Sequence, residues 1–448
     1  MKARTLRQLW RTSLVTGLLP LALGSSAQTA PQWNGRPLSM SSSAAVASTT
    51  PISTVRPPTN LYVSDYEAIA TAMTTEGNVP GMAMAIVQGG RVLTARGYGV
   101  TDVSNPQSID AHTVFRLASL SKAFASAVTG VLVNDGVLRW DSRLTDYLPS
   151  FQLSQPGAAE QLTVADILSQ RTGLERNTFD RDIEGNADYH MLTAKLATAP
   201  MLCAPGTCYG YQNVAFSLIG DVVFAATGHF YPETVASRIF KPLGMNDASY
   251  GLEGITSSAR WAHPHIRSGR GWAALTPKPT YYRLEPAAGV NASISDMAQW
   301  LLAQTGHRPD VLPAPLLATL HAPLVSTPGE MTVASWRHAR LTDANYALAW
   351  RDYNYAGHDV VFHGGAVQGY RAVIALVPER DLGVVILWNS ESALPSALLP
   401  TILDDALGIE GGGQWLDDPS NGLPASVLYA RRRPAAGTDA SSSKASPP

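Results

Sequence analysis

A serine and a lysine stand three positions apart where an apolar helical pattern begins, in the segment Phe115 to Phe124. Residues three apart on a helix share a face, so the Ser119 hydroxyl and the Lys122 amine are expected to approach one another. A serine hydroxyl becomes a nucleophile when a neighbouring group takes its proton, and a lysine can do so once burial lowers its pKa. The pair predicts a covalent serine catalyst, although the spacing alone also fits a solvated helix start.

A second candidate segment, Tyr211-Gln212-Asn213, precedes an apolar helical pattern that begins at Val214. Residues two apart in an extended segment project to the same side, which places the phenol and the amide together. A tyrosine near a cation can carry a lowered pKa and serve as a general base, and an asparagine offers both a donor and an acceptor. The alternative is a buried tyrosine followed by an asparagine that caps the helix.

A third segment is a strand-like run, Val360 to Phe362, that leads into His363-Gly364-Gly365. Glycine at a strand edge allows another backbone or a ligand to come close. A backbone N–H at this edge, together with that of Ser119, would form an oxyanion hole. The alternative is a glycine-rich hairpin that carries a surface histidine.

In this order the three segments resemble the motifs Ser-x-x-Lys, Tyr-x-Asn and Lys/His-x-Gly of the serine penicillin-recognising enzymes. That superfamily comprises the class C β-lactamases, the serine D-Ala-D-Ala peptidases and the β-lactamase-like esterases. The resemblance spans about residues 61–409 and extends to supporting stretches at 168–174, 242–245 and 288–293. It implies an antiparallel sheet flanked by helices, a mainly helical region, and an active site between the two.

The resemblance also implies a role for each residue of the first two motifs. Ser119 would be the acyl-accepting nucleophile, and Lys122 would share or relay its proton. Tyr211 would be a general acid and base, and Asn213 would orient the substrate and Lys122. Whether Lys122 or Tyr211 accepts the first proton stays open.

In the third motif, the resemblance implies that Gly365 shapes the strand edge and that the N–H groups of Ser119 and Ala366 form the oxyanion hole. His363 stands where class C β-lactamases have a lysine. A histidine is only partly charged at neutral pH, so it would hold a substrate carboxylate less firmly than lysine does. This departure disfavours a specialised β-lactamase.

The resemblance leaves the bond that is cleaved open. An amide of a D-amino-acid peptide, a β-lactam and a simple ester are the candidates, and a β-lactamase-like carboxylesterase or a non-catalytic penicillin-binding protein are the alternatives. Other hydrolase classes are disfavoured because the chain has neither a Gly-x-Ser-x-Gly elbow nor a His-Glu-x-x-His motif. No cofactor or metal is expected. Four aromatic residues either line an apolar acyl pocket or pack loops: Trp261, Trp272, Tyr281 and Tyr282.

The elements that must position these residues form an α+β pattern. A helix is expected over 66–73, followed by strands over 82–87 and 92–95 joined at Gly89-Gly90. Residues 136–286 read as the helical part, and strand-like runs return at 347–350, 360–362, 370–377 and 382–388. The sheet part is therefore expected at about 61–135 and 287–410, within one hydrolase domain over 61–410.

Composition and charge indicate which classes of partner the protein is expected to bind. The chain has 448 residues, of which 45% are hydrophobic and 15% charged, and a formal net charge of −2. This length is ample for a large core. Arg431-Arg432-Arg433 is an isolated basic run in the tail, so no nucleic-acid partner is expected. A small-molecule or peptide substrate is the expected partner.

Residues 1–27 are typical of a secretory signal peptide, because basic residues precede the apolar stretch Leu14 to Leu23 and small residues follow it. The alternative is an uncleaved anchor, although the stretch is shorter than the roughly 20 residues of a membrane span. No stable membrane span is expected after removal of the signal, and the protein is expected to be exported, either periplasmic or secreted. Residues 28–60 and 411–448 are expected to be a disordered linker and a C-terminal tail.

Two cysteines, Cys203 and Cys208, flank a Pro-Gly turn shortly before Tyr211. In an exported protein such a close pair forms a disulfide more often than a metal site. The sequence therefore predicts a small closed loop that stiffens the segment after it. Two free thiols are the alternative.

Overall fold

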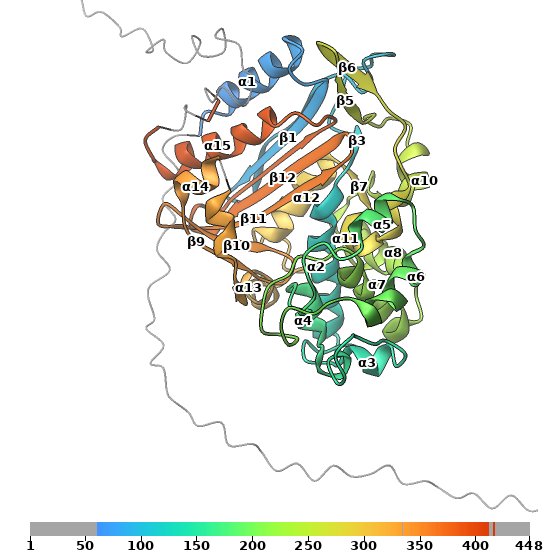
Figure 1. The fold of residues 1–448 in the computed structure, drawn as a ribbon. Coiled ribbons are helices and arrows are strands. Elements are labelled where there is room, and N and C mark those ends of the chain that lie inside the picture. The colour runs from blue at the N-terminus through green and yellow to red at the C-terminus, as the bar shows by residue number, and fades with distance from the viewer. Residues whose placement is uncertain (1–60, 334, 412–414, 417–448) are drawn as a thin grey trace, which may run out of the picture. The chain divides into compact units, whose positions relative to one another are not determined.

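The computed structural model describes residues 61–333, 335–411 and 415–416. An eight-stranded antiparallel sheet runs in the order β2-β1-β13-β12-β11-β10-β9-β8, and it confirms the expected α+β class (Figure 1). The first two strands are β1 (Gly81–Gln88) and β2 (Arg91–Gly99), and β1 pairs with the last strand, β13 (Leu382–Trp388). The other strands are β8 (Val325–Ser326), β9 (Leu341–Tyr346), β10 (Arg351–Tyr355), β11 (His358–Val367) and β12 (Tyr370–Val377). The expected signal peptide, the linker and most of the expected tail lie outside the described residues.

Alternating side chains give the sheet two apolar faces. Every second residue of β1, beginning at Met82, packs in one core with helices α1 (Val63–Thr75) and α15 (Leu398–Leu407). The residues between them, beginning at Ala83, pack on the opposite face with α2 (Ser121–Asn134) and α12 (Ile294–Gln304). The period of two along a strand explains this division, and both faces are buried because helices cover both (Figure 1).

The region between β3 and β7 is mainly helical. Besides α2, its helices are α3 (Leu144–Tyr147), α4 (Val164–Leu168), α5 (Asp180–Glu184), α6 (Tyr189–Lys195), α7 (Val214–Thr227), α8 (Tyr231–Val235), α9 (Lys241–Leu243), α10 (Gly251–Thr256) and α11 (Glu285–Ala288). A small sheet, ordered β3 (Val114–Arg116), β7 (Val290–Ser293) and β4 (Ser249–Tyr250), joins the two ends of this region. In the described part of the chain, no single helix is long and apolar enough to cross a membrane, and one bent pair, Val214–Thr227 with Tyr231–Leu243, passes that test only as a pair.

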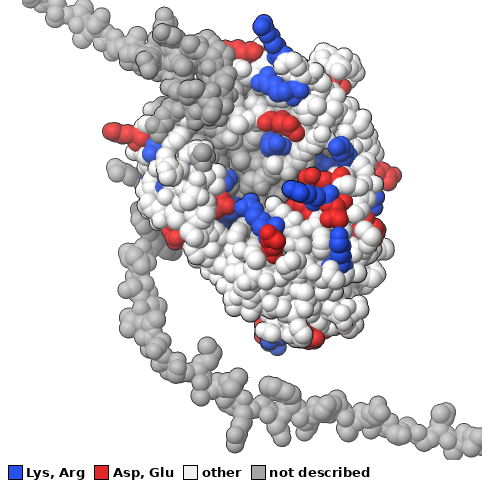
Figure 2. Space-filling model, in the orientation of Figure 1, with Lys and Arg blue, Asp and Glu red and all other residues white. Residues whose placement is uncertain are grey.

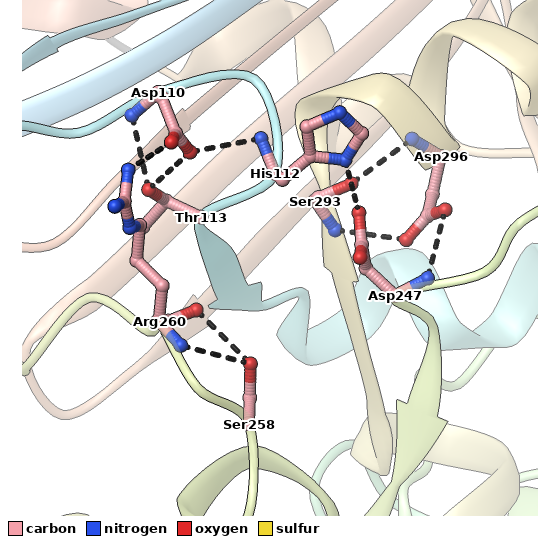
Figure 3. Close-up of polar contacts among 8 residues, drawn as sticks. All are labelled: Asp110, His112, Thr113, Asp247, Ser258, Arg260, Ser293 and Asp296. Carbon is pink, nitrogen blue, oxygen red and sulfur yellow. Dashed lines mark hydrogen bonds and ion pairs between the residues drawn. The ribbon is translucent and has the colours of Figure 1, made fainter.

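Polar side chains anchor the small sheet (Figure 3). Just before β3, the Asp110 carboxylate accepts a hydrogen bond from Thr113 Oγ1 at 3.0 Å and forms an ion pair with Arg260. Just after β7, Ser293 and Asp296 form a capping box at the start of α12. These contacts fix both strands that flank the segment containing Ser119.

One predicted strand is wrong. Residues 347–350 form a tight turn between β9 and β10, in which the Ala347 N–H donates to the Trp350 carbonyl at 2.7 Å and Ala349 has a φ of +62°. The run is apolar because the turn is buried, not because it is a strand. The true strand follows it at Arg351–Tyr355, and its alternating charged, polar and aromatic residues do not resemble an apolar strand.

Candidate active site

Ser119 lies in a 3-10 turn, Ala118–Leu120, that leads directly into α2. Ala118 has a φ of +50°, a backbone conformation that non-glycine residues rarely adopt and that is often found at functional sites. The Ser121 hydroxyl holds the turn, because it donates to the Ala118 carbonyl at 2.6 Å and accepts from the Val290 N–H at 3.0 Å. Ser119 is thereby presented to a hollow of about 660 Å³.

Lys122 is fully buried on the first turn of α2. Its Nζ donates to Asn213 Oδ1 at 2.6 Å and to the Ala287 carbonyl at 3.1 Å, and it lies 4.7 Å from the centre of the Tyr211 ring. Burial lowers the pKa of Lys122 to about 7, while Asp180 opposes this shift. Near neutral pH a large fraction of the amine is therefore uncharged and able to accept a proton.

Tyr211 lines the same hollow as Ser119. Burial raises the pKa of Tyr211 to about 12, and the Ser119 side chain only partly opposes this shift, so the lowered pKa expected for a tyrosine near a cation is not found. Tyr211 therefore holds its proton at neutral pH. The Gln170 side chain fixes the Tyr211 segment, since its Oε1 accepts from the Gln212 N–H at 2.7 Å and its Nε2 donates to the Gln212 carbonyl at 3.2 Å.

Asn213 lies at the start of α7, but its side chain does not cap that helix. Its Oδ1 accepts from Lys122, and its Nδ2 donates to Asp180 Oδ2 at 2.8 Å. The alternative interpretation of Asn213 as a helix cap is therefore wrong. The amide instead connects the buried amine to a carboxylate on α5.

The expected disulfide between Cys203 and Cys208 is present. The loop that it closes is hydrogen-bonded to the segment containing Gln170, since the Gly206 N–H donates to the Arg171 carbonyl at 2.7 Å and the Gly210 N–H donates to the Gln170 carbonyl at 2.9 Å. The disulfide loop and the Gln170 segment together support the backbone that leads to Tyr211.

Gly365 lets strand β11 approach the turn of Ser119. A Cβ atom at this position would lie 2.5 Å from the Leu117 carbonyl oxygen and 3.3 Å from the Ser119 nitrogen. No side chain fits in that space. Glycine is needed here because the backbone of the Ser119 turn comes close to the strand edge. Ala366, the next residue of β11, lines the same hollow as Ser119.

The structure corrects the expectation of a partly charged His363. The ring is buried; its Nδ1 donates to the Gly364 carbonyl at 2.8 Å, and its Nε2 lies 3.3 Å from the Tyr346 hydroxyl. Burial, with Arg351 and Lys122 nearby, lowers the pKa of His363 well below its usual value. The ring is therefore neutral, and it does not line the hollow as its neighbours Gly364 and Gly365 do.

Five charged residues that line the hollow were not predicted from the sequence: Asp180, Arg337, Arg351, Arg371 and Glu391. Arg351 and Arg337 share one carboxylate, since Glu330 lies 2.7 Å from Arg351 Nη1 and 2.9 Å from Arg337 Nη1. The cluster of Arg351, Arg337 and Glu330 carries a net positive charge, although the Asp180 and Glu391 carboxylates also line the hollow. These residues belong to no short motif, so only their position in the fold reveals them. Of the four aromatic residues considered for an acyl pocket, Tyr281 lines the hollow.

Comparison with known proteins identifies the family. The model of the Beta-lactamase family matches residues 66–407, and the chain belongs to this family. Among curated relatives, the chain is 28% identical over 388 residues to unguisins hydrolase ungD' of Aspergillus campestris, covering 82% of this chain and 71% of that protein. It is 26% identical to Protein flp of Staphylococcus aureus over 71% of this chain, and it spans only 61% of that relative.

Solved structures share the fold. The penicillin-binding protein homologue from Pyrococcus abyssi, described as octameric, superposes with a TM-score of 0.69 at 23% identity, covering 78% of each chain. A class C beta lactamase from Rhodobacter sphaeroides gives a TM-score of 0.60 at 22% identity, covering 77% of this chain and 98% of that one. At these identities the likeness concerns the fold, which is that of the β-lactamases and penicillin-binding proteins.

Proposed function

We propose that this protein is a serine hydrolase that cleaves an amide, β-lactam or ester bond through an acyl-enzyme on Ser119. One observation carries the proposal: Ser119 and Tyr211 line the same hollow, and the buried Lys122, whose pKa is about 7, lies 4.7 Å from the centre of the Tyr211 ring. A nucleophile within reach of a base that is neutral at working pH is the arrangement that covalent catalysis needs. Membership of the Beta-lactamase family supports the same reaction class.

In the proposed acylation, Ser119 Oγ attacks the substrate carbonyl carbon. The serine proton passes to the Tyr211 hydroxyl as that hydroxyl gives its own proton to neutral Lys122. The N–H groups of Ser119 and Ala366 hold the negative oxygen of the tetrahedral intermediate. When the bond to the leaving group breaks, Tyr211 protonates the leaving group and recovers a proton from Lys122, so that the amine is neutral again.

Deacylation repeats these steps with water. A water molecule attacks the acyl carbon and passes a proton through Tyr211 to Lys122. The ester bond to Ser119 then breaks, the serine oxygen regains a proton, and the acid product leaves. Asn213 keeps Lys122 in place throughout, because Nζ is hydrogen-bonded to its Oδ1.

The charges beside the hollow bear on the substrate class. We propose that Arg351 and Arg337, rather than His363, attract a substrate carboxylate, since both line the hollow whereas His363 is neutral and buried. D-amino-acid peptides and β-lactams carry such a carboxylate, and simple esters do not. The cleaved bond is accordingly proposed to be an amide or a β-lactam.

We also propose that the protein acts outside the cytoplasm. The disulfide between Cys203 and Cys208 supports this location, because disulfides persist in oxidising compartments. The basic and apolar pattern of residues 1–27 is a second support.

The test is intact mass spectrometry after incubation with a fluorescent penicillin, nitrocefin and a p-nitrophenyl ester. We expect an acyl adduct or turnover that Ser119→Ala abolishes and that Ser396→Ala, a serine lining the same hollow, retains. A stable penicillin adduct would indicate a peptidase, and rapid nitrocefin hydrolysis a β-lactamase. Neither adduct nor turnover with any of the probes would support the non-catalytic alternative instead.

A further inference from the structure

We propose that a second hollow beside the active site, built on Arg116, binds an anionic group of the substrate, such as a carboxylate, that extends past Ala366. This inference rests on the proposed function and adds a second recognition point to it. The hollow of Arg116 is not lined by Arg351 or Arg337, so this recognition point is separate from the one proposed above.

Arg116, at the end of β3, is a buried cation with unsatisfied donors. Only 4% of the residue is exposed, and its guanidinium carbon lies 3.5 Å from the centre of the Tyr282 ring. Nη1 donates to the Lys278 carbonyl at 3.2 Å, while Nε and Nη2 are buried and have no hydrogen-bond partner among the described residues. Buried cations are normally paired, because removing them from water without a partner is costly. The two free donors point to a missing acceptor.

The hollow of Arg116 is continuous with that of Ser119. It measures about 400 Å³, and five residues line both hollows: Tyr281, Ala366, Val367, Arg371 and Glu391. Ala366 is the proposed oxyanion donor, so a substrate held at Ser119 reaches the Arg116 hollow by extending beyond this residue. The two hollows therefore form one groove along the end of β11.

Among the residues that the structure describes, no carboxylate forms an ion pair with Arg116. The face drawn in Figure 2 carries basic and acidic side chains close together, and the Arg116 hollow is lined by Lys278 and Arg371 as well as Glu184 and Glu391. Glu391 acts on Arg371, whose pKa it raises against burial. Glu184 accepts from the Tyr281 hydroxyl at 3.3 Å.

Burial lowers the pKa of Arg116, and the groups that oppose this shift are tyrosines alone. An incoming carboxylate would gain two charge-assisted hydrogen bonds there, from donors that already lack partners. Lys278 and Gln368 lie exposed at the rim of the hollow, so their side chains can move aside to admit a ligand.

The test compares paired esters that differ in one charge. The acids are p-nitrophenyl hemisuccinate, hemiglutarate and hemiadipate, and the neutral controls are the p-nitrophenyl esters of butanoate, pentanoate and hexanoate. We expect the wild type to favour the acid over its neutral match at one chain length or more. Arg116→Gln is expected to lower that ratio of kcat/KM by about 10- to 100-fold, and Arg116→Lys to retain part of it.

Each neutral ester is an internal control, because a general loss of folding or catalysis lowers both members of a pair. Arg267→Gln, which removes a cation that lines neither hollow, should leave the ratio unchanged. A ratio that Arg116→Gln does not alter, while the esters are still turned over, would overturn the proposal.

A binding measurement decides the matter even where no ester reacts. We expect radiolabelled glutarate or adipate to bind the Ser119→Ala protein in equilibrium dialysis and to lose binding when Arg116→Gln is added. Equal binding to both proteins, or binding to neither, would reject the Arg116 site. Lack of any Ser119 adduct, with Arg116-dependent binding retained, would reject the hydrolase proposal alone.

Discussion

Lys122 and Asp180 bind opposite ends of a single amide group. The Asn213 carbonyl oxygen accepts from Lys122 at 2.6 Å, and its nitrogen donates to Asp180 at 2.8 Å. Asp180 raises the pKa of Lys122 against the lowering caused by burial. The Asp180 carboxylate thus fixes the orientation of the Asn213 amide and also raises the pKa of Lys122.

Asp180→Asn should therefore move the acid limb of the pH–rate profile to lower pH. The new amide oxygen can still accept from Asn213, but the negative charge that favours protonated Lys122 is gone. The pKa of Lys122 falls, so the neutral amine persists at lower pH. The acid limb is expected to move by about one pH unit. The measurement is kcat/KM for acylation between pH 4.5 and 9. Glu184→Gln, one turn further along α5, is the control and should not move the limb; an unmoved limb in Asp180→Asn would remove the tuning role.

His363→Gln should leave the position of the acid limb unchanged while lowering the rate. The histidine is neutral because burial holds its pKa well below the usual value, so it does not titrate in the range where Lys122 does. The loss of rate, about tenfold, would follow from disturbance of Tyr346 and β11. A limb that shifts or disappears in this variant would show that a charged His363 controls activity, as the sequence suggested.

Tyr211→Phe should reduce kcat by about 10²- to 10⁴-fold, because it removes the hydroxyl that is proposed to relay the Ser119 proton and to protonate the leaving group. Tyr209→Phe is the matched control. Tyr209 is also held protonated by burial, but its hydroxyl has no hydrogen-bond partner in the part of the chain that the structure describes. Equal rates for the two variants would assign proton transfer to Lys122 without Tyr211.

Gly365→Ala should lower both stability and activity. Its Cβ would meet the Leu117 carbonyl at 2.5 Å, and this backbone cannot yield without moving the Ser119 turn. We expect a loss of about 1–3 kcal/mol in the free energy of unfolding and of about 10²-fold in kcat/KM.

Gly364→Ala is the neighbouring control for that substitution, since a Cβ there would meet its nearest neighbour, the Phe362 ring, at an ordinary 3.6 Å. Denaturant unfolding and steady-state kinetics on both variants make the comparison. Similar losses in the two would mean that close approach at Gly365 is not what matters.

Local sequence patterns determined the core of the site. The spacing of Ser119 and Lys122, the Tyr211-to-Asn213 segment and the glycines after His363 could be read directly, because each depends on neighbours within a few residues. The same holds for β1, β12 and β13, whose apolar residues are buried on both faces of the sheet. The disulfide could also be predicted, since the chain has only two cysteines.

Only the tertiary structure decided which charged residues gather beside the site and which of the titratable groups there carry a proton. Arg116, Asp180 and Arg351 come from three distant segments, and no local pattern shows that they line one groove. Protonation depends on how completely the fold excludes water and on which charges it brings near. This is why burial makes Lys122 a candidate base and keeps His363 neutral, although the sequence indicated only that one was a lysine and the other a histidine.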